Sequence, residues 1–317
     1  MNNNKITYTL ITGASEGLGK ALAIECARRR MNLILVALPG PELYSLAAFI
    51  KRNYAVDVIG IEKDLCRDES CIELFNEVHA LDLPVNMLIN NAGIGGTALF
   101  EEGSIKLYEK QIKLNVLATT LITRLFLEKL KSNSQSYILN VGSMASFFYL
   151  PKKQVYGATK SFIYFFSKTL RKELKKDNVF VSVLCPGGMN TSLDLTLMNK
   201  TGNYLSRLSI MDPEEVVPIA INALLRGKEV IIPGRMNRFF MLLDKILPQG
   251  IKKILTGKTM EKINPEHSLV HYLYKKSCFN AACVAECAGC NRNPESKLPR
   301  QGGPHNSQRS AQINTVR

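Results

Sequence analysis

Residues 12–19, Thr-Gly-Ala-Ser-Glu-Gly-Leu-Gly, constrain the fold more than any other stretch, because their glycines lie between a strand pattern and a helix pattern. Residues 6–11 are apolar and largely β-branched, and residues 20–30 have helical composition. Glycines let the backbone turn tightly and approach a pyrophosphate, which then lies at a helix amino terminus where free N–H groups favour an anion. This context predicts a nucleotide-phosphate turn.

Strand-like apolar runs recur along the chain after this turn, and stretches of helical composition separate them. This alternation predicts an α/β fold with a parallel sheet covered on both faces. Right-handed crossovers would place the loops that follow the strands on one edge. The expected strands are 6–11, 32–37, 56–61, 85–89, 137–139, 179–184 and 230–234. The expected helices include 20–30, 69–78, 104–131, one at Tyr156 and one capped by Asp212.

Tyr156 and Lys160 stand four residues apart near the start of a predicted helix, so both side chains lie on one helical face. A neighbouring cation favours the phenolate and would lower the pKa of the tyrosine toward the working range of an acid/base group. Such a pair taken alone is more typical of a solvated helix surface. Ser143, however, follows the apolar run 137–139 and is expected at the carboxyl end of a strand, where open α/β sheets bind ligands.

Three other polar positions have a structural and a functional interpretation. Asn115 lies on an otherwise apolar face of helix 104–131 and is either a structural knot or part of a polar relay. Residues 90–93, Asn-Asn-Ala-Gly, end a strand and can bind a cofactor edge or form a turn. Asp64 could meet an adenine, or cap the helix 69–78.

Together these residues resemble the classical short-chain dehydrogenase/reductase family over residues 6–235. The motifs that carry the resemblance are residues 12–19, 90–93, Asn115, Ser143, Tyr156 with Lys160, and Pro-Gly-Gly-Met-Asn-Thr at 186–191. The resemblance implies a Rossmann-type doubly wound sheet in a single catalytic domain. It also implies an NAD(P)-dependent enzyme that interconverts a carbonyl and an alcohol by hydride transfer.

The resemblance also assigns expected roles. Tyr156 would exchange a proton with the substrate oxygen, and Ser143 would hydrogen-bond that oxygen. Lys160 would bind the nicotinamide ribose and lower the Tyr156 pKa, while Asn115 would hold a water linked to Lys160. The residues expected to line the cofactor are Gly13, Ser15, Gly17, Leu18, Gly19, Asp64, Leu65, Asn91, Ala92, Gly93, Tyr156, Lys160, Pro186, Gly187 and Thr191.

The choice between NAD and NADP stays open. A carboxylate after the second strand would bind the ribose 2′-hydroxyl of NAD, and an arginine there would pair with the 2′-phosphate of NADP. Leu38 and Pro39 follow that strand instead, and Glu16 occupies the place before the second glycine of the turn, where family members that prefer NADP usually carry a basic residue. Because the carboxylate that would bind NAD is missing, the sequence weakly favours NADP.

Apolar residues on two segments suggest a lipophilic carbonyl or alcohol substrate, such as an acyl chain or a sterol. Residues 192–211 would form an apolar lid, and residues 144–150 an apolar wall after Ser143. The alternative is that these residues only pack on each other. The strongest competing function is a catalytically silent cofactor-binding sensor or scaffold of the same fold, but the catalytic set shows no departure from the family pattern.

The carboxyl-terminal quarter has a different character. More than half of the net charge of +14 lies after residue 235. We expect a catalytic domain at 1–235, a basic amphipathic extension at 236–276 and a disordered tail at 277–317. Segment 236–263 could contact a membrane interface, or cover the pocket or the sheet edge. Four clustered cysteines (278, 283, 287 and 290) could bind zinc, but their spacing is irregular and no metal is predicted.

The remaining expectations concern partners and location. The basic tail lacks aromatic interleaving, so no nucleic-acid partner is expected. Relatives pair the helices around Asn115 and after Tyr156, which implies a homo-oligomer, a dimer or a tetramer. Neither a secretory signal nor a spanning apolar run is recognisable, so we expect a cytoplasmic protein, with membrane contact at its periphery as the alternative.

Overall fold

A computed structural model describes residues 6–191, 196 and 209–246, and the account below concerns these residues. Seven parallel strands form one sheet in the order β3-β2-β1-β4-β5-β6-β7. The order reverses between β1 and β4, which creates the switch point where such sheets bind ligands. The strands are β1 Tyr8–Thr12, β2 Asn32–Ala37, β3 Val58–Glu62, β4 Val85–Asn90, β5 Ser136–Val141, β6 Val179–Leu184 and β7 Val230–Ile231.

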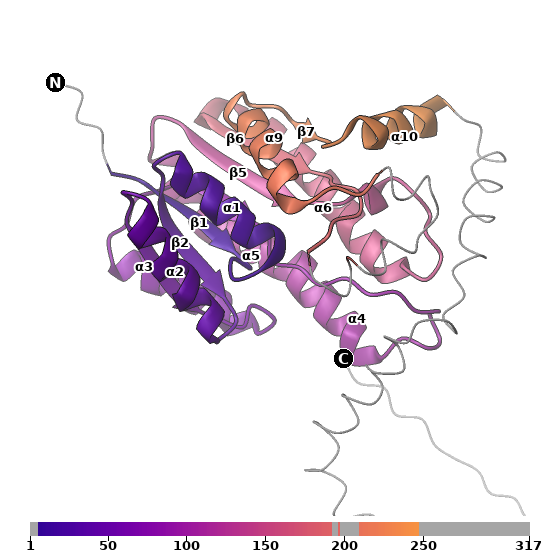
Figure 1. Cartoon of the computed structure of the whole chain (residues 1–317), viewed down its shortest axis with the longest axis horizontal. Coiled ribbons are helices and arrows are strands. Elements are labelled where there is room, and N and C mark those ends of the chain that lie inside the picture. Colours follow the sequence, from indigo (N-terminus) through magenta and orange to yellow (C-terminus); the bar gives the residue numbers. More distant parts are fainter. Residues whose placement is uncertain (1–5, 192–195, 197–208, 247–317) are drawn as a thin grey trace, which may run out of the picture. The chain divides into compact units, whose positions relative to one another are not determined.

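Helices cover both faces of the sheet, as Figure 1 shows, so the Rossmann-type fold is confirmed. One core cluster joins α1, α2 and α9 to the sheet, and a second joins α3, α5 and the carboxyl-terminal part of α6 to the other face. The helices are α1 Gly17–Arg28, α2 Pro41–Asn53, α3 Asp68–Ala80, α4 Ile105–Ile112, α5 Thr119–Lys131, α6 Gln154–Glu173, α9 Pro213–Leu225 and α10 Arg235–Ile246.

The segment expected as one helix over 104–131 is three consecutive helical pieces. A π-helical stretch, Lys113–Ala118, separates α4 from α5 and contains Asn115. A π-helix places one extra residue in the turn and often marks a functional site. The side-chain periodicity stays nearly helical through such a turn, which explains why the pattern predicted an uninterrupted helix.

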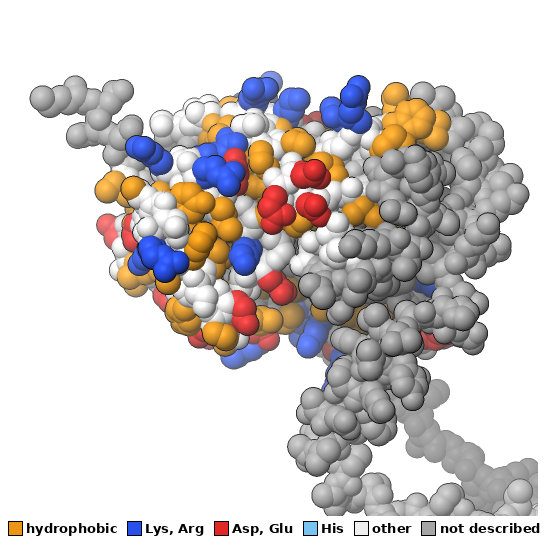
Figure 2. All heavy atoms as spheres, in the orientation of Figure 1, with side chains coloured by type: hydrophobic (Ala, Val, Ile, Leu, Met, Phe, Trp, Pro, Cys, Tyr) orange, Lys and Arg blue, Asp and Glu red, His pale blue; other side chains and the backbone are white. Residues whose placement is uncertain are grey.

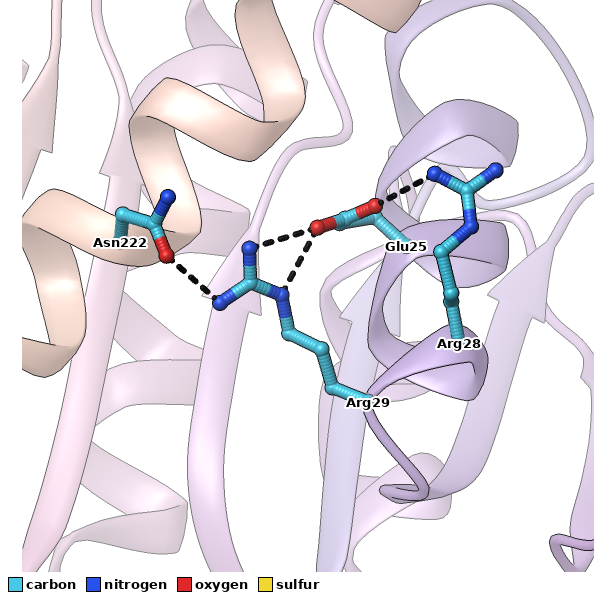
Figure 3. Close-up of polar contacts among 4 residues, drawn as sticks. All are labelled: Glu25, Arg28, Arg29 and Asn222. Atoms are coloured by element: carbon cyan, nitrogen blue, oxygen red, sulfur yellow. Dashed lines mark hydrogen bonds and ion pairs between the residues drawn. The ribbon is translucent and has the colours of Figure 1, made fainter.

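An ionic clasp holds α1 against α9, as drawn in Figure 3. The Glu25 carboxylate is buried on α1 and accepts hydrogen bonds from Arg28 (3.1 Å) and Arg29 (2.8 Å). Arg29 also donates to the side-chain oxygen of Asn222 on α9 at 2.8 Å. Because the helix that follows the glycine turn is fixed at its far end, the turn itself has a defined position.

The chain divides into two units, 1–264 and 265–317, and every described residue belongs to the first. Most of the expected lid (192–211) and the chain beyond 246, with its four clustered cysteines, lie outside the described residues. The proposed boundaries at 235 and 276 therefore stay predictions. Within the described part, no helix combines the length and hydropathy that crossing a bilayer requires. Figure 2 shows cationic, anionic and apolar side chains interspersed on the visible face.

Candidate active site

The side chains of Tyr156, Lys160 and Ser143 come together at the carboxyl end of β5. Tyr156 and Lys160 lie in the first two turns of α6, and Ser143 follows β5 directly. A hydrogen bond joins the side chains of Ser143 and Tyr156. The Lys160 ammonium donates to the Val141 carbonyl oxygen at 2.8 Å and lies 5.9 Å from the centroid of the Tyr156 ring. The three predicted catalytic side chains thus share one small volume.

Burial dominates the electrostatics of this group. It raises the pKa of Tyr156, and the hydrogen bond from Ser143 opposes that rise. Burial also lowers the pKa of Lys160 to about 8, because a buried ammonium loses its hydration. We expected Lys160 to lower the phenol pKa; the largest effect on the phenol is instead its own desolvation, and Ser143 supplies the opposing contribution.

Two neighbours of the group escaped the sequence analysis. The Lys153 ammonium lies 5.6 Å from the centroid of the Tyr156 ring, so a second cation adjoins the phenol. Cys185, directly after β6, is fully buried, and its burial raises the pKa of its thiol to about 12, so it is a neutral group beside Lys160. Neither a lysine before a helix nor a single cysteine after a strand carries a pattern that would have identified them.

Asn115 forms a hydrogen-bonded knot between two segments and α6. Its side-chain oxygen accepts from the backbone N–H of Ile94 at 2.8 Å, and its amide donates to the Ile94 carbonyl oxygen at 3.0 Å. The same amide donates to the Thr159 hydroxyl at 3.0 Å, and that hydroxyl donates to the Tyr156 carbonyl oxygen. The structural interpretation of Asn115 is therefore correct, whereas its role in a water relay stays a prediction.

The glycine turn forms a cradle that side chains would fill. A Cβ atom on Gly19 would lie 1.9 Å from the Gly13 carbonyl oxygen, and Gly13 and Gly17 have φ values of 63° and 52°. Asn91 fastens this turn to β4, because its amide donates to the carbonyl oxygens of Thr12 and Gly13 at 3.0 and 2.9 Å. Open backbone at the amino terminus of α1 fits the pyrophosphate of a dinucleotide.

The other expected cofactor residues lie at the same edge of the sheet, with different exposures. Asp64 is exposed and accepts from the Cys66 N–H at 3.0 Å, so it shapes its own turn, while Arg67 is the N-cap of α3. Leu65 is buried in the core. Any contact from Leu65 to an adenine would therefore come from its backbone, whereas the Asp64 side chain is open to solvent.

Segment 186–191 closes the site beside the glycine turn. The Pro186 carbonyl oxygen accepts from the Met144 N–H at 2.8 Å, which attaches the segment to the turn after Ser143. The Thr191 side chain faces Gly17, since a Cβ atom there would lie 3.1 Å from the Thr191 Cβ. The remaining residues expected at the cofactor, Ser15, Leu18, Ala92, Gly93 and Gly187, belong to these same turns.

An apolar cluster adjoins the catalytic group. Met144, Phe147 and Phe148 pack with α6 and with Phe240 and Met241 of α10. Helix α10 thus covers this end of the sheet with one face, while Phe239 and Leu242 are 52% and 54% exposed. No group of three His, Cys, Asp or Glu side chains within the described part is arranged to hold a metal ion.

The model of the short chain dehydrogenase family matches residues 7–201. The 3-oxoacyl-[acyl-carrier-protein] reductase of Aquifex aeolicus is 30% identical over 217 residues, which cover 67% of this chain and 88% of the relative. The human 17-beta-hydroxysteroid dehydrogenase type 3 is 28% identical over 210 residues, covering 64% of this chain and 67% of the relative.

A solved structure supports the same assignment. The short-chain dehydrogenase of Sphingobium yanoikuyae, determined in complex with NADPH, superposes with a TM-score of 0.67 at 27% identity. The match covers 83% of this chain and 98% of that one.

Proposed function

Because the chain belongs to the short chain dehydrogenase family, we propose that Tyr156, Ser143 and Lys160 carry out the acid/base chemistry of this NAD(P)-dependent oxidoreductase. When bound, the dinucleotide supplies or accepts the hydride. The observation that carries the proposal is the hydrogen bond between the Ser143 and Tyr156 side chains, because it keeps the two hydroxyls close enough for one substrate oxygen to contact both. An oxidoreductase that interconverts a carbonyl and an alcohol needs such a point.

In the direction of reduction, the Tyr156 phenol donates its proton to the substrate oxygen as the carbonyl becomes an alcohol. Ser143 donates a hydrogen bond to the same oxygen and thereby stabilises the developing negative charge. Lys160 holds positive charge 5.9 Å from the phenol ring, which favours the phenolate left after proton transfer. In the direction of oxidation, the phenolate takes the proton from the alcohol. Lys160, Gly93 and the glycine turn would hold the dinucleotide.

The substrate is proposed to be lipophilic. Met144, Phe147 and Phe148 form an apolar wall next to the catalytic group, although they also pack against α10. One relative is named for 3-oxoacyl groups on a carrier protein and the other for 17-beta-hydroxysteroids, so the reacting carbonyl or alcohol of each belongs to an acyl or steroid body. An apolar pocket with a few convergent polar groups binds such molecules well.

Replacement of Tyr156 by phenylalanine tests the proposed chemistry. Turnover with a panel of ketones should fall by about 10²–10⁴-fold or more, because the proton donor is lost, while NADPH and NADH still bind. Tyr54→Phe is a matched control, since Tyr54 is the C-cap of α2 and lies outside the candidate site. Unchanged turnover in Tyr156→Phe would reject the assignment. Wild-type protein that binds dinucleotide yet converts no carbonyl would favour a silent sensor or scaffold.

A substrate screen tests the proposed substrate class. Long-chain 3-oxoacyl thioesters and steroid ketones should give higher kcat/KM values than sugars and small hydroxy acids. Phe148→Ala should lower kcat/KM for the long substrates more than for a short ketone. Faster conversion of small polar substrates would reject the lipophilic class.

We also propose that the chain forms a homo-oligomer through the outer faces of α4 and α6. A groove of about 450 Å³ runs between these helices, and its lining includes Ile112, Val116, Val155 and Phe162. Ile112 and Phe162 are 52% and 41% exposed, which leaves apolar area for a second copy to cover. Light scattering should give a dimer or tetramer for the wild type and a monomer for Phe162→Glu; a monomeric wild type would contradict the proposal.

Peripheral membrane contact through residues 236–263 is a separate proposal for a cytoplasmic protein. The exposed Phe239 and Leu242 on α10, together with Arg238, support it for the described part of this segment. Flotation with anionic liposomes should recover the wild type and should fail for Phe239→Ser/Leu242→Ser. The contact would be rejected if the variant floated as well as the wild type, or if the wild type did not float.

A further inference from the structure

The turn between β2 and α2 contains a carboxylate that comes from the neighbouring strand. Ala37, the last residue of β2, pairs with Glu62, the last residue of β3. The Glu62 side chain reaches across and accepts a hydrogen bond from the Gly40 N–H at 3.0 Å. Gly40 is the N-cap of α2, so Glu62 lies at the positive end of that helix.

This turn is the part of the fold that meets the adenosine ribose. In doubly wound sheets the residue after the second strand contacts the ribose 2′ position, through a carboxylate for a free hydroxyl or through an arginine for a phosphate. Residues 37–42 contain neither a basic residue nor an acid directly after β2. Glu62 supplies a carboxylate to this place from β3, which no inspection of β2 alone would find.

The turn also has few groups that could bind a phosphate. Pro39 and Pro41 have no N–H group, so Gly40 provides the one backbone donor of these three residues, and Glu62 uses it. The Glu42 carboxylate folds back toward the same glycine, since a Cβ atom on Gly40 would lie 2.7 Å from it. Two carboxylates therefore lie where a 2′-phosphate, with a charge near −2, would come.

The nearest lysine along β3 does not offset these charges. Lys63 donates its backbone N–H to the Ala37 carbonyl oxygen, but its ammonium pairs with Glu73 at 3.3 Å and Glu77 at 3.4 Å on α3. Glu16, before the second glycine of the first turn, is exposed and adds a further negative charge on the cofactor edge. The charges on the β2–α2 turn itself, from Glu62 and Glu42, are thus negative.

We propose that Glu62 is a cofactor-specificity residue: its carboxylate occupies the amide donor of the β2–α2 turn and weakens the binding of NADP(H) relative to NAD(H). This inference rests on the proposed function, because it requires a dinucleotide in the cradle. It concerns the ratio of two affinities, so it is separable from the catalytic assignment.

Glu62→Gln tests the proposal, because glutamine keeps an oxygen for the Gly40 N–H and removes the charge. Full-length wild type and variant are titrated with NADPH and with NADH, and binding is followed by the fluorescence of the reduced nicotinamide. The NADPH dissociation constant should fall by about tenfold in the variant, while that of NADH changes by less than about twofold. Adenosine 2′,5′-bisphosphate and 5′-AMP, used as competitors, should show the same difference.

The control is Glu173→Gln, which makes the same charge change at the carboxyl-terminal end of α6, on the opposite edge of the sheet. This variant should leave the ratio of the NADPH and NADH dissociation constants unchanged. If the ratio of the two dissociation constants is the same in Glu62→Gln as in the wild type, the role of Glu62 is overturned and the proposed function is not. If the wild type binds neither dinucleotide, the proposed function is overturned as well. If Glu62→Gln does not fold, Glu42→Gln is measured instead. The NADPH dissociation constant divided by that of NADH should then fall by about threefold, and an unchanged value would overturn the proposal.

Discussion

The Asn115 side-chain amide donates a hydrogen bond of 3.0 Å to the Thr159 hydroxyl, and this bond joins the π-helical stretch to the helix that carries Tyr156 and Lys160. The Thr159 hydroxyl in turn donates a hydrogen bond of 2.8 Å to the Tyr156 carbonyl oxygen. Both partners are buried, so the bond is protected from water. The position of Tyr156 therefore depends on Asn115, a residue from a different helical segment.

Asn115→Ala should destabilise the protein by about 1–3 kcal/mol, because the partly buried Ile94 N–H and C=O groups lose their side-chain partner and the buried Thr159 hydroxyl loses its donor. Denaturant unfolding measures this change. Turnover should fall more than dinucleotide binding, since α6 loses its attachment near Tyr156. The control Asn53→Ala removes only an exposed bond to the Phe49 carbonyl oxygen and should cost less than about 1 kcal/mol. Equal costs in the two variants would contradict the importance of the knot.

Ser143→Ala should raise the pKa of Tyr156 further, because the hydrogen bond that lowers it is removed. The kcat/KM for alcohol oxidation needs the phenolate, so its rise with pH should move to higher pH. The variant should also lose about 10²–10³-fold in rate, as when one oxyanion donor is removed. Ser146→Ala is the control: its buried hydroxyl has no hydrogen-bond partner in the described structure, and its profile should match the wild type.

Lys160→Met should stabilise the ligand-free protein near pH 7 while abolishing turnover. Burial lowers the pKa of Lys160 from 10.5 to about 8, so keeping the ammonium charged costs the folded state roughly 3 kcal/mol below pH 8. Between pH 8 and 10.5 the unfolded chain keeps a proton that the folded chain has lost. Wild-type stability from this group therefore rises with pH in that window. Thermal unfolding of both proteins from pH 7 to 10.5 should show the gap closing; a constant gap would reject this account.

Glu25→Gln should lower the unfolding free energy by about 1–3 kcal/mol, because Arg29 loses the carboxylate that orients it toward Asn222. For a domain of this size the melting temperature should fall by about 2–4 °C per kcal/mol. Arg28 is 64% exposed at the same carboxylate, so Arg28→Ala should cost about 0–1 kcal/mol. A larger loss in Arg28→Ala than in Glu25→Gln would contradict the described clasp.

Local pattern predicted the architecture well, because each element carries its own signal. The glycine turn, the apolar strand runs and the Tyr156–Lys160 spacing all lie within a few residues of chain, where backbone sterics and periodicity act directly. The fold, the family and the oxidoreductase activity follow from these signals. Element ends shifted by one to a few residues, as in β1, which is Tyr8–Thr12 where 6–11 was expected.

What the sequence by itself determined is therefore the order of elements, the family and the oxidoreductase activity, while the phosphate-binding turn and the acid/base side chains are its predictions. Only the tertiary structure decided that Asn115 is bonded to Ile94 and Thr159, that burial raises the phenol pKa, and that Glu62 lies at Gly40. These features join residues distant in the chain, and their energies depend on which groups lose water when the layers pack together. The hydrophobic periodicity of one segment cannot predict this desolvation, because it does not specify which side chains of other segments will pack against it.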